Sequence, residues 1–149
     1  AVPVRSVPEF IAAARARPGG LTMVSSGVGT SSHLVTALFA QSVGIELTHV
    51  PFNGAAPAQA AILGGQVQAG FLNATIAVAP IQSGALRGLA VTAERRWPDL
   101  PEVPTMPELG HAGVLAGSWY GVLAPAGLPA ALRDRIHADL AAALAQPAL

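Results

Sequence analysis

The chain has 149 residues with eight basic and eight acidic side chains, so its formal net charge at pH 7 is zero. This balance argues against a nucleic-acid-binding protein, whose basic residues would cluster on one face. Cysteine is absent, which excludes disulfides, thiolate metal sites and a cysteine nucleophile. The length suits one ordinary domain, and no run of about 18 strongly apolar residues indicates a transmembrane helix.

The centre of the sequence carries almost no charge. Between Arg17 and Arg87 the only formally charged side chain is Glu46. Gly, Ala, Ser, Thr, Val and Leu fill this stretch, a composition typical of a folded segment rather than a disordered one. An anion bound there would be held mainly by neutral donors, such as backbone N–H groups and hydroxyls.

Strands and helices are predicted to alternate along the first part of the chain. A helix begins near Ser6, which suits an N-cap, and a Pro-Gly-Gly sequence at 18–20 ends it. This rhythm is typical of βαβ units, so we expect an α/β fold with a mostly parallel sheet and helices on both faces. The strands are expected over 21–25, 46–52, 67–72 and 86–92, and the intervening helices over 30–43, 54–63 and 75–82.

The pattern changes after residue 93. Four prolines between 94 and 117 predict a surface excursion with one short helical turn at 106–109. A fifth strand is expected over 119–124, followed by a final helix from Pro129 to about residue 145. Helical spacing gives this last helix an apolar face made of Leu132, Ile136, Leu140 and Leu144.

A loop of Gly, Ser and Thr, residues 25–33, links the first strand to the following helix. The first N–H groups of a helix lack intrahelical acceptors and carry partial positive charge. Glycines let a ligand approach the backbone, and hydroxyls add donors. The loop therefore predicts a site for a carboxylate or another anion, although Thr30 or Ser31 acting only as a helix cap would explain the same pattern. The candidate ligand-binding residues are Ser26, Gly27, Gly29, Thr30, Ser31 and His33.

Two further loops are predicted to reach the same edge of the sheet. Residues 51–58 join the second strand to its helix, and Asn73 follows the third strand. The carboxyl ends of parallel strands lie at one edge, where open α/β sheets bind ligands. We therefore expect Gly54, Ala55, Ala56 and Asn73 to contribute to the same site.

Nucleotide-binding and metal-binding patterns are not met. Gly27 and Gly29 begin a dinucleotide fingerprint, but Ser32 stands in place of its third glycine, and Glu46 begins the next strand instead of ending it. A chain without lysine has no Walker motif. We expect no cofactor and no metal ion, because no metal-type spacing links the four histidines, His33, His49, His111 and His137.

The enzymatic alternative is a small serine hydrolase that uses Ser31 or Ser32 with His33. Ser32 and His33 are adjacent instead of standing on a G-x-S-x-G elbow, so we expect a binding protein and not an enzyme. His49, inside a predicted strand, is interpreted as a hydrogen-bonded core or edge residue.

A family resemblance rests on seven segments, taken in order: 25–33, 49–58, 63–67, 101–105, 108–110, 118–121 and 124–129. These segments resemble the tripartite tricarboxylate transporter substrate-binding proteins, also called Bug or TctC-like receptors. The resemblance implies a periplasmic receptor with two α/β lobes of the type II periplasmic-binding-protein fold. Such a receptor would close around a small organic acid or amino acid and hand it to a membrane permease. It would hold the ligand through the loop residues named above.

By resemblance, residues 1–117 form the second, ligand-binding lobe, and residues 118–149 form a crossover strand and helix that normally belong to the first lobe. The chain is then expected to be an isolated second lobe or a truncated relative without a signal peptide. Its last helix would pack on this sheet or exchange between chains in a domain-swapped homo-oligomer. A stand-alone module that senses or binds a carboxylate without transport stays open as an alternative.

Overall fold

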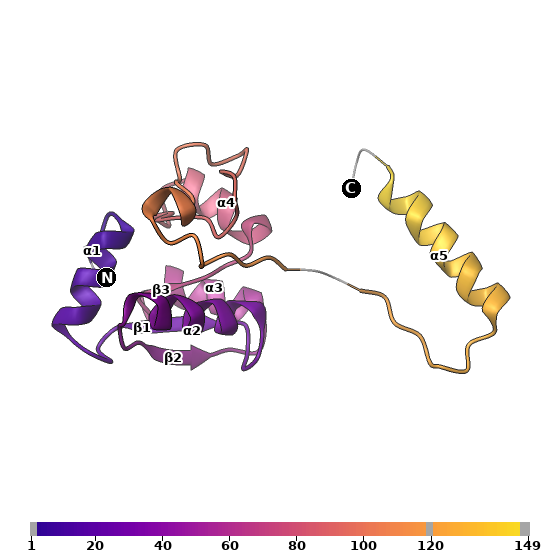
Figure 1. Cartoon of the computed structure of the whole chain (residues 1–149), viewed down its shortest axis with the longest axis horizontal. Helices are drawn as coiled ribbons and strands as arrows, with labels where there is room; N and C mark the ends of the chain where they lie inside the picture. Colours follow the sequence, from indigo (N-terminus) through magenta and orange to yellow (C-terminus); the bar gives the residue numbers. More distant parts are fainter. Residues whose placement is uncertain (1–2, 119–120, 147–149) are drawn as a thin grey trace. The chain divides into compact units, whose positions relative to one another are not determined.

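The structure is a computed structural model and describes residues 3–118 and 121–146. The chain divides into two compact units, unit 1 (residues 1–118) and unit 2 (residues 119–149). Unit 2 contains α5 (Ala130–Leu144) (Figure 1). Unit 1 contains α1 (Val7–Ala16), β1 (Thr22–Ser25), α2 (Ser31–Val43), β2 (Thr48–Pro51), α3 (Ala55–Leu63), β3 (Ala69–Gly70), α4 (Ala74–Gln82) and the short 3-10 helix η1 (Pro107–Leu109).

The central strand of unit 1 is β1, which lies between β2 and β3 in a three-stranded parallel sheet. Its pairing with β2 runs from Thr22 opposite Thr48 to Ser25 opposite Pro51. Because all three strands run in the same direction, the loops that follow them begin at one edge of the sheet. The sequence prediction of an α/β fold with a parallel sheet is therefore confirmed.

Alternate residues of β1 enter two different cores, as the period of a strand requires. Met23 packs in a cluster with residues of α1 and α2, including Phe10 and Phe39. Val24 belongs to a second cluster with Ala58 and Ala61 of α3, among others. Helices therefore cover both faces of the sheet, as predicted.

The third strand is shorter than the predicted 67–72 and covers only Ala69–Gly70. Before it, the Gln68 side chain replaces the backbone ladder, because its carbonyl oxygen accepts the Thr22 N–H at 2.6 Å and also pairs with the Thr22 hydroxyl. Residues 66–68 form bends instead of a strand, and Val67 packs in the α3 cluster.

The prediction of a strand over 86–92 is wrong, because this segment forms only a single parallel bridge, between Val91 and Thr105. Two bonds make the bridge: Val91 N–H donates to the Pro104 carbonyl, and Met106 N–H donates to the Val91 carbonyl, each at 2.9 Å. The ladder stops on one side because Pro104 has no N–H to donate. It stops on the other side because Glu108 N–H is already bonded to the Thr105 hydroxyl.

Part of the strand predicted over 119–124 lies outside the described residues, since 119 and 120 are not described. Residues 121–124 are not in a strand, which corrects that prediction. A strand needs a partner for its backbone groups, and the described part of unit 2 holds α5 as its one regular element. The predicted division into two lobes stays a prediction.

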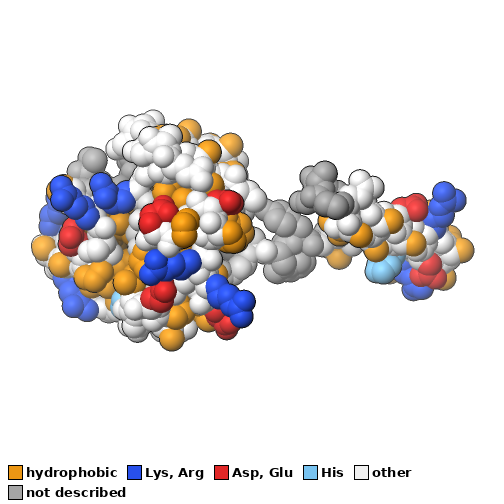
Figure 2. All heavy atoms as spheres, turned by 90° about the horizontal axis from the view of Figure 1, so that it is seen from above, with side chains coloured by type: hydrophobic (Ala, Val, Ile, Leu, Met, Phe, Trp, Pro, Cys, Tyr) orange, Lys and Arg blue, Asp and Glu red, His pale blue; other side chains and the backbone are white. Residues whose placement is uncertain are grey.

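The apolar face predicted for the last helix is present on α5 and remains exposed. Leu132 is 48% exposed and Leu144 is 76% exposed, and no described residue of α5 is buried. Figure 2 shows apolar side chains on the surface of this unit beside charged ones. Among the described residues, the chain has no helix that combines the length and the apolar character needed to cross a membrane.

Thr105 and Glu108 form a reciprocal capping box around η1, within the proline-rich excursion. The Glu108 carboxylate accepts the Thr105 N–H at 2.7 Å, and the Thr105 hydroxyl accepts the Glu108 N–H at 3.1 Å. Arg96 also pairs with this carboxylate at 3.0 Å. The hydrogen bond from Thr105, and secondarily the one from Arg96, lower the pKa of Glu108 below its usual value.

We predict that Glu108→Gln lowers the melting temperature at neutral pH, because the neutral amide weakens both contacts. A lowered carboxyl pKa stabilises the folded state above the ordinary value of 4.5, and this stabilisation is lost as the pH falls through the lowered pKa. The difference in melting temperature between the wild type and Glu108→Gln should therefore disappear in acid. Glu102→Gln, an exposed site in the same excursion, is the matched control. Equal melting curves for both variants across the pH range would contradict this account.

Candidate ligand-binding site

The first two predicted loops meet at the carboxyl edge of the sheet. Phe52 N–H donates to the Ser25 carbonyl at 3.0 Å, and Gly54 N–H donates to the Ser26 carbonyl at 3.1 Å. These two bonds continue the pairing of β1 and β2 beyond the strands themselves. The structure therefore brings the glycine-rich loop directly beside the N-terminus of α3.

The third predicted loop reaches the same edge because β3 pairs with the other side of β1. Asn73 lies at the N-cap of α4. Its side-chain oxygen accepts a hydrogen bond from the Ser118 hydroxyl at 3.1 Å. Asn73 thus links the start of α4 to the last residue of unit 1, next to the point where the chain leaves this unit.

Four N–H groups of the glycine-rich loop donate to acceptors within its own segment, residues 25–33. Gly27 and Gly29 adopt positive φ angles of 140° and 79°, which favour glycine. The loop amides that sequence reasoning offered to a ligand are thus used to fix the shape of the loop. The bonds run from Ser26 N–H to Ser32 Oγ (3.0 Å), Gly27 N–H to Ser25 Oγ (3.2 Å), Gly29 N–H to His33 Nδ1 (3.0 Å) and Thr30 N–H to the Gly27 carbonyl (3.3 Å).

The helices that follow these loops begin without a side-chain cap. Thr30, at the N-cap of α2, donates its hydroxyl to the Gly27 carbonyl at 2.7 Å and accepts no helix N–H. The alternative interpretation, in which Thr30 acts only as a side-chain cap of α2, therefore does not hold for Thr30. At α1, by contrast, the Ser6 hydroxyl accepts the Glu9 N–H at 3.3 Å.

The uncapped helix starts leave seven N–H groups without an acceptor among the described residues. Each helix N-terminus carries partial positive charge, roughly half an elementary charge. Three such termini at one edge favour an anion although the neighbouring sequence has almost no charged side chain. The groups belong to Ser31, Ser32 and His33 of α2, Ala55 and Ala56 of α3, and Ala74 and Thr75 of α4.

His33 and His49 stack beside the loop, with ring centroids 4.0 Å apart and 7° between the ring planes. His49 Nε2 lies 2.5 Å from Ser25 Oγ, so the interpretation of His49 as a hydrogen-bonded residue is confirmed. Burial lowers the pKa of His49, and the neighbouring His33 lowers it further. Sequence reasoning did not connect Ser25, Ser32 or His49 to the shape of the loop.

The serine–histidine geometry differs from that of the hydrolase alternative. His33 Nδ1 accepts from Gly29, and among the described residues neither Ser31 nor Ser32 has a hydrogen bond to His33. Ser25 and His49 do lie within hydrogen-bonding distance, but Ser25 is only 1% exposed. A substrate therefore has no access to this serine in the structure.

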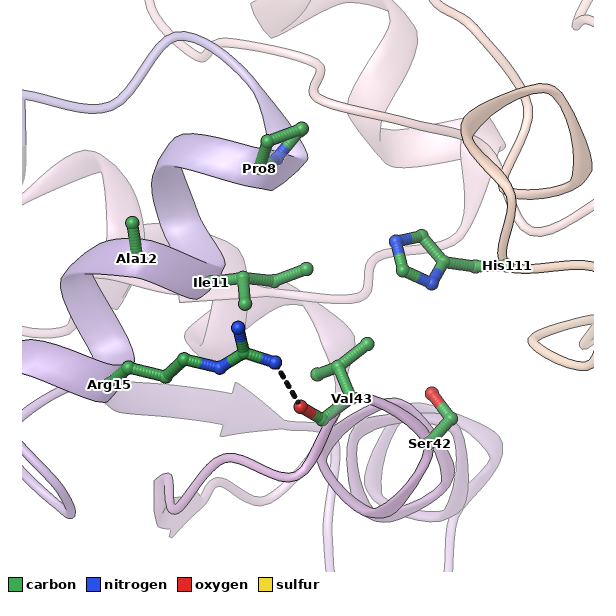
Figure 3. A pocket seen from close by; sticks show the side chains of 7 residues that line it. All are labelled: Pro8, Ile11, Ala12, Arg15, Ser42, Val43 and His111. Atoms are coloured by element: carbon green, nitrogen blue, oxygen red, sulfur yellow. Dashed lines mark hydrogen bonds between the residues drawn. The ribbon is translucent and has the colours of Figure 1, made fainter.

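A cavity of about 470 Å³ lies at the other end of α2, away from the loops. Figure 3 shows Arg15 reaching from α1 toward Val43, whose carbonyl accepts its guanidinium hydrogen bond at 2.8 Å. This cation therefore caps the C-terminal end of α2, where the helix dipole is negative. A second cavity of about 320 Å³ includes Ala74 and Thr75 at the start of α4.

The family described as the tripartite tricarboxylate transporter family receptor (TctC) matches residues 1–149. The chain belongs to this family. A Pseudomonas sp. (strain P51) relative, described as the UPF0065 protein in the tcbD-tcbE intergenic region, is 39% identical over 144 residues. That match covers 96% of this chain and 43% of the relative.

Two solved structures from Rhodopseudomonas palustris share the fold. Rpa4515 with adipate has a TM-score of 0.92 at 36% identity, over 99% of this chain and 50% of that chain. MatC with bound malate has a TM-score of 0.89 at 29% identity, over 97% of this chain and 49% of that chain. This TctC-family chain thus spans about half the length of the solved relatives that it matches.

We predict that Ser32→Ala loosens the glycine-rich loop, because Ser32 Oγ is the acceptor for the Ser26 N–H. The loss of one such bond should lower the unfolding free energy by about 1 kcal/mol and speed exchange of the Ser26 amide. Ser31→Ala is the matched control, since no hydrogen bond from the Ser31 hydroxyl is present among the described residues and both substitutions are in the first turn of α2. Chemical denaturation and amide exchange measure both effects; equal losses for the two variants would contradict the assignment.

Proposed function

We propose that this chain is the ligand-binding part of a periplasmic receptor that captures small dicarboxylates for a tripartite tricarboxylate-type permease. The observation that carries the proposal is the meeting of three uncapped helix N-termini at one edge of a sheet with almost no charge. Two solved relatives contain adipate and malate, and both of these ligands are dicarboxylates. Receptors of this family are periplasmic, which supports the same location for this chain.

One carboxylate of the ligand would accept hydrogen bonds from the N-terminal turn of α2. The Ser31 N–H and hydroxyl and the Ser32 N–H are its proposed donors. The Ala55 and Ala56 N–H groups of α3 and the region of Asn73 would complete the same shell. Neutral donors of this kind stabilise an anion through dipoles and hydrogen bonds instead of through a salt bridge.

The second part of the proposal concerns the organisation of the receptor. Residues 1–117 would be one lobe, and residues 118–149 would contribute a crossover and helix to the other. The exposed apolar face of α5 supports this proposal, because a stripe of Leu and Ile needs a surface to cover it. In a chain without the other lobe, the same face would instead pair two copies of the chain through a domain swap.

The proposal assigns the chain to binding and not to catalysis. Its relatives are solute-binding receptors, and the buried Ser25 beside His49 offers no accessible nucleophile. Ser31 and Ser32 would act as hydrogen-bonding groups for the ligand and for the loop.

We predict that this chain binds adipate in the millimolar range, because one lobe supplies only part of the contacts that enclose a ligand. Isothermal titration calorimetry measures the affinity, with adipamide as the matched control that keeps the length of the ligand and removes both charges. Adipamide should give no measurable heat of binding. Micromolar or tighter binding of adipate would contradict the half-site account, and equal binding of adipamide would contradict the anion site.

A further inference from the structure

The two stacked histidines hold both positive-φ glycines of the loop. His33 accepts the Gly29 N–H directly through Nδ1 at 3.0 Å. At the second ring, His49 Nε2 lies 2.5 Å from Ser25 Oγ, and this oxygen accepts the Gly27 N–H at 3.2 Å. The ring stack between them joins the first turn of α2 to β2.

The hydrogen bond from Gly29 requires an unprotonated Nδ1 on His33. A ring nitrogen that accepts an N–H must itself be unprotonated, so the neutral ring carries its proton on Nε2. Protonation at Nδ1 would point a ring N–H at the Gly29 N–H and break this bond. A second positive charge on His49, stacked at 4.0 Å, would repel the first.

The sequence around the two histidines carries little formal charge. The formal charge nearest in sequence to His49 is Glu46, which precedes β2 and therefore lies toward the other edge of the sheet. Burial is the main cause that lowers the pKa of His49, and the nearby His33 lowers it further. The neutral form of His49 is thus favoured, and the stability that it adds is lost as the pH falls below the ordinary value of 6.5.

We propose that His33 and His49 are positioning residues whose neutral stack fixes the glycine-rich loop, and that protonation of His33 releases Gly29 and weakens carboxylate binding. The release of Gly29 by protonation of His33 is independent of the proposed function. The weakening of carboxylate binding rests on the proposed function. The positive charge gained by His33 favours an anion only weakly in water and salt. Loss of the hydrogen bond between Gly29 and His33, by contrast, loosens the turn that leads into the N-terminus of α2.

The loop step is tested without any ligand, by NMR of the chain labelled with nitrogen-15. At about pH 8, above the range in which histidine titrates, the Gly29 nitrogen should show a coupling through the hydrogen bond to His33 Nδ1. This coupling should vanish at about pH 5, below the range in which histidine ordinarily titrates, together with a shift of the Gly29 amide. A Gly29 amide that does not respond to pH would overturn the proposal.

Two variants distinguish the role of His33 as a hydrogen-bond acceptor from its role as an aromatic ring in the stack. His33→Asn keeps an acceptor for Gly29 but cannot titrate, so its Gly29 amide should stay hydrogen-bonded from about pH 8 to about pH 5. His33→Phe keeps an aromatic ring and removes the acceptor, so its Gly29 amide should be unbonded throughout. A His33→Asn protein whose Gly29 amide titrates like the wild type would overturn the role of His33.

The ligand step is tested with adipate at the same two pH values. Wild-type affinity should fall about threefold to tenfold relative to His33→Asn between about pH 8 and about pH 5, which corresponds to one lost hydrogen bond. The ratio to His33→Asn cancels protonation of adipate itself. A constant ratio would overturn the coupling to binding. Absence of adipate binding by either protein at any pH would overturn the proposed function, and the Gly29 signals would still decide the loop step.

Discussion

The parallel pairing of β1 with strands on both of its sides is the constraint on which the rest of unit 1 depends. Because of this pairing, all three strands end at the same edge of the sheet, and a helix begins after each of them. The two cores meet on the same strand, because Met23 and Val24 point to opposite faces of the sheet and belong to different clusters. The candidate site is therefore a consequence of sheet topology before it is a consequence of any side chain.

Within this frame, the polar groups at the edge divide into two kinds. Side chains such as Ser32 and His33 satisfy the loop amides and fix the turn. The first-turn amides of the helices stay available, since the Thr30 hydroxyl bonds backward to the loop. This division explains how a segment with almost no charge can present an anion site. The donors are preorganised, so less ordering is needed when an anion binds.

The sequence allowed the fold class and most helices to be predicted, because apolar periodicity and Gly or Pro punctuation are local signals. The prediction of a strand over 86–92 was wrong because of residues outside that segment. Its ladder partner contains Pro104, and the next donor, Glu108, is bonded to Thr105 instead. The glycine-rich loop could be identified as a candidate site from its composition. Its internal bonding could not, since the stack of His33 on His49 joins residues from two separate elements.

The central claim, that the uncapped helix N-termini bind a carboxylate, is tested most directly by mapping backbone amide shifts as adipate is added to the chain. The account predicts that the largest shifts occur at Ser31 to His33 of α2, at Ala55 and Ala56 of α3, and at Ala74 and Thr75 of α4. Shifts confined to the cavity around Arg15 and His111, or no saturable shifts, would contradict it.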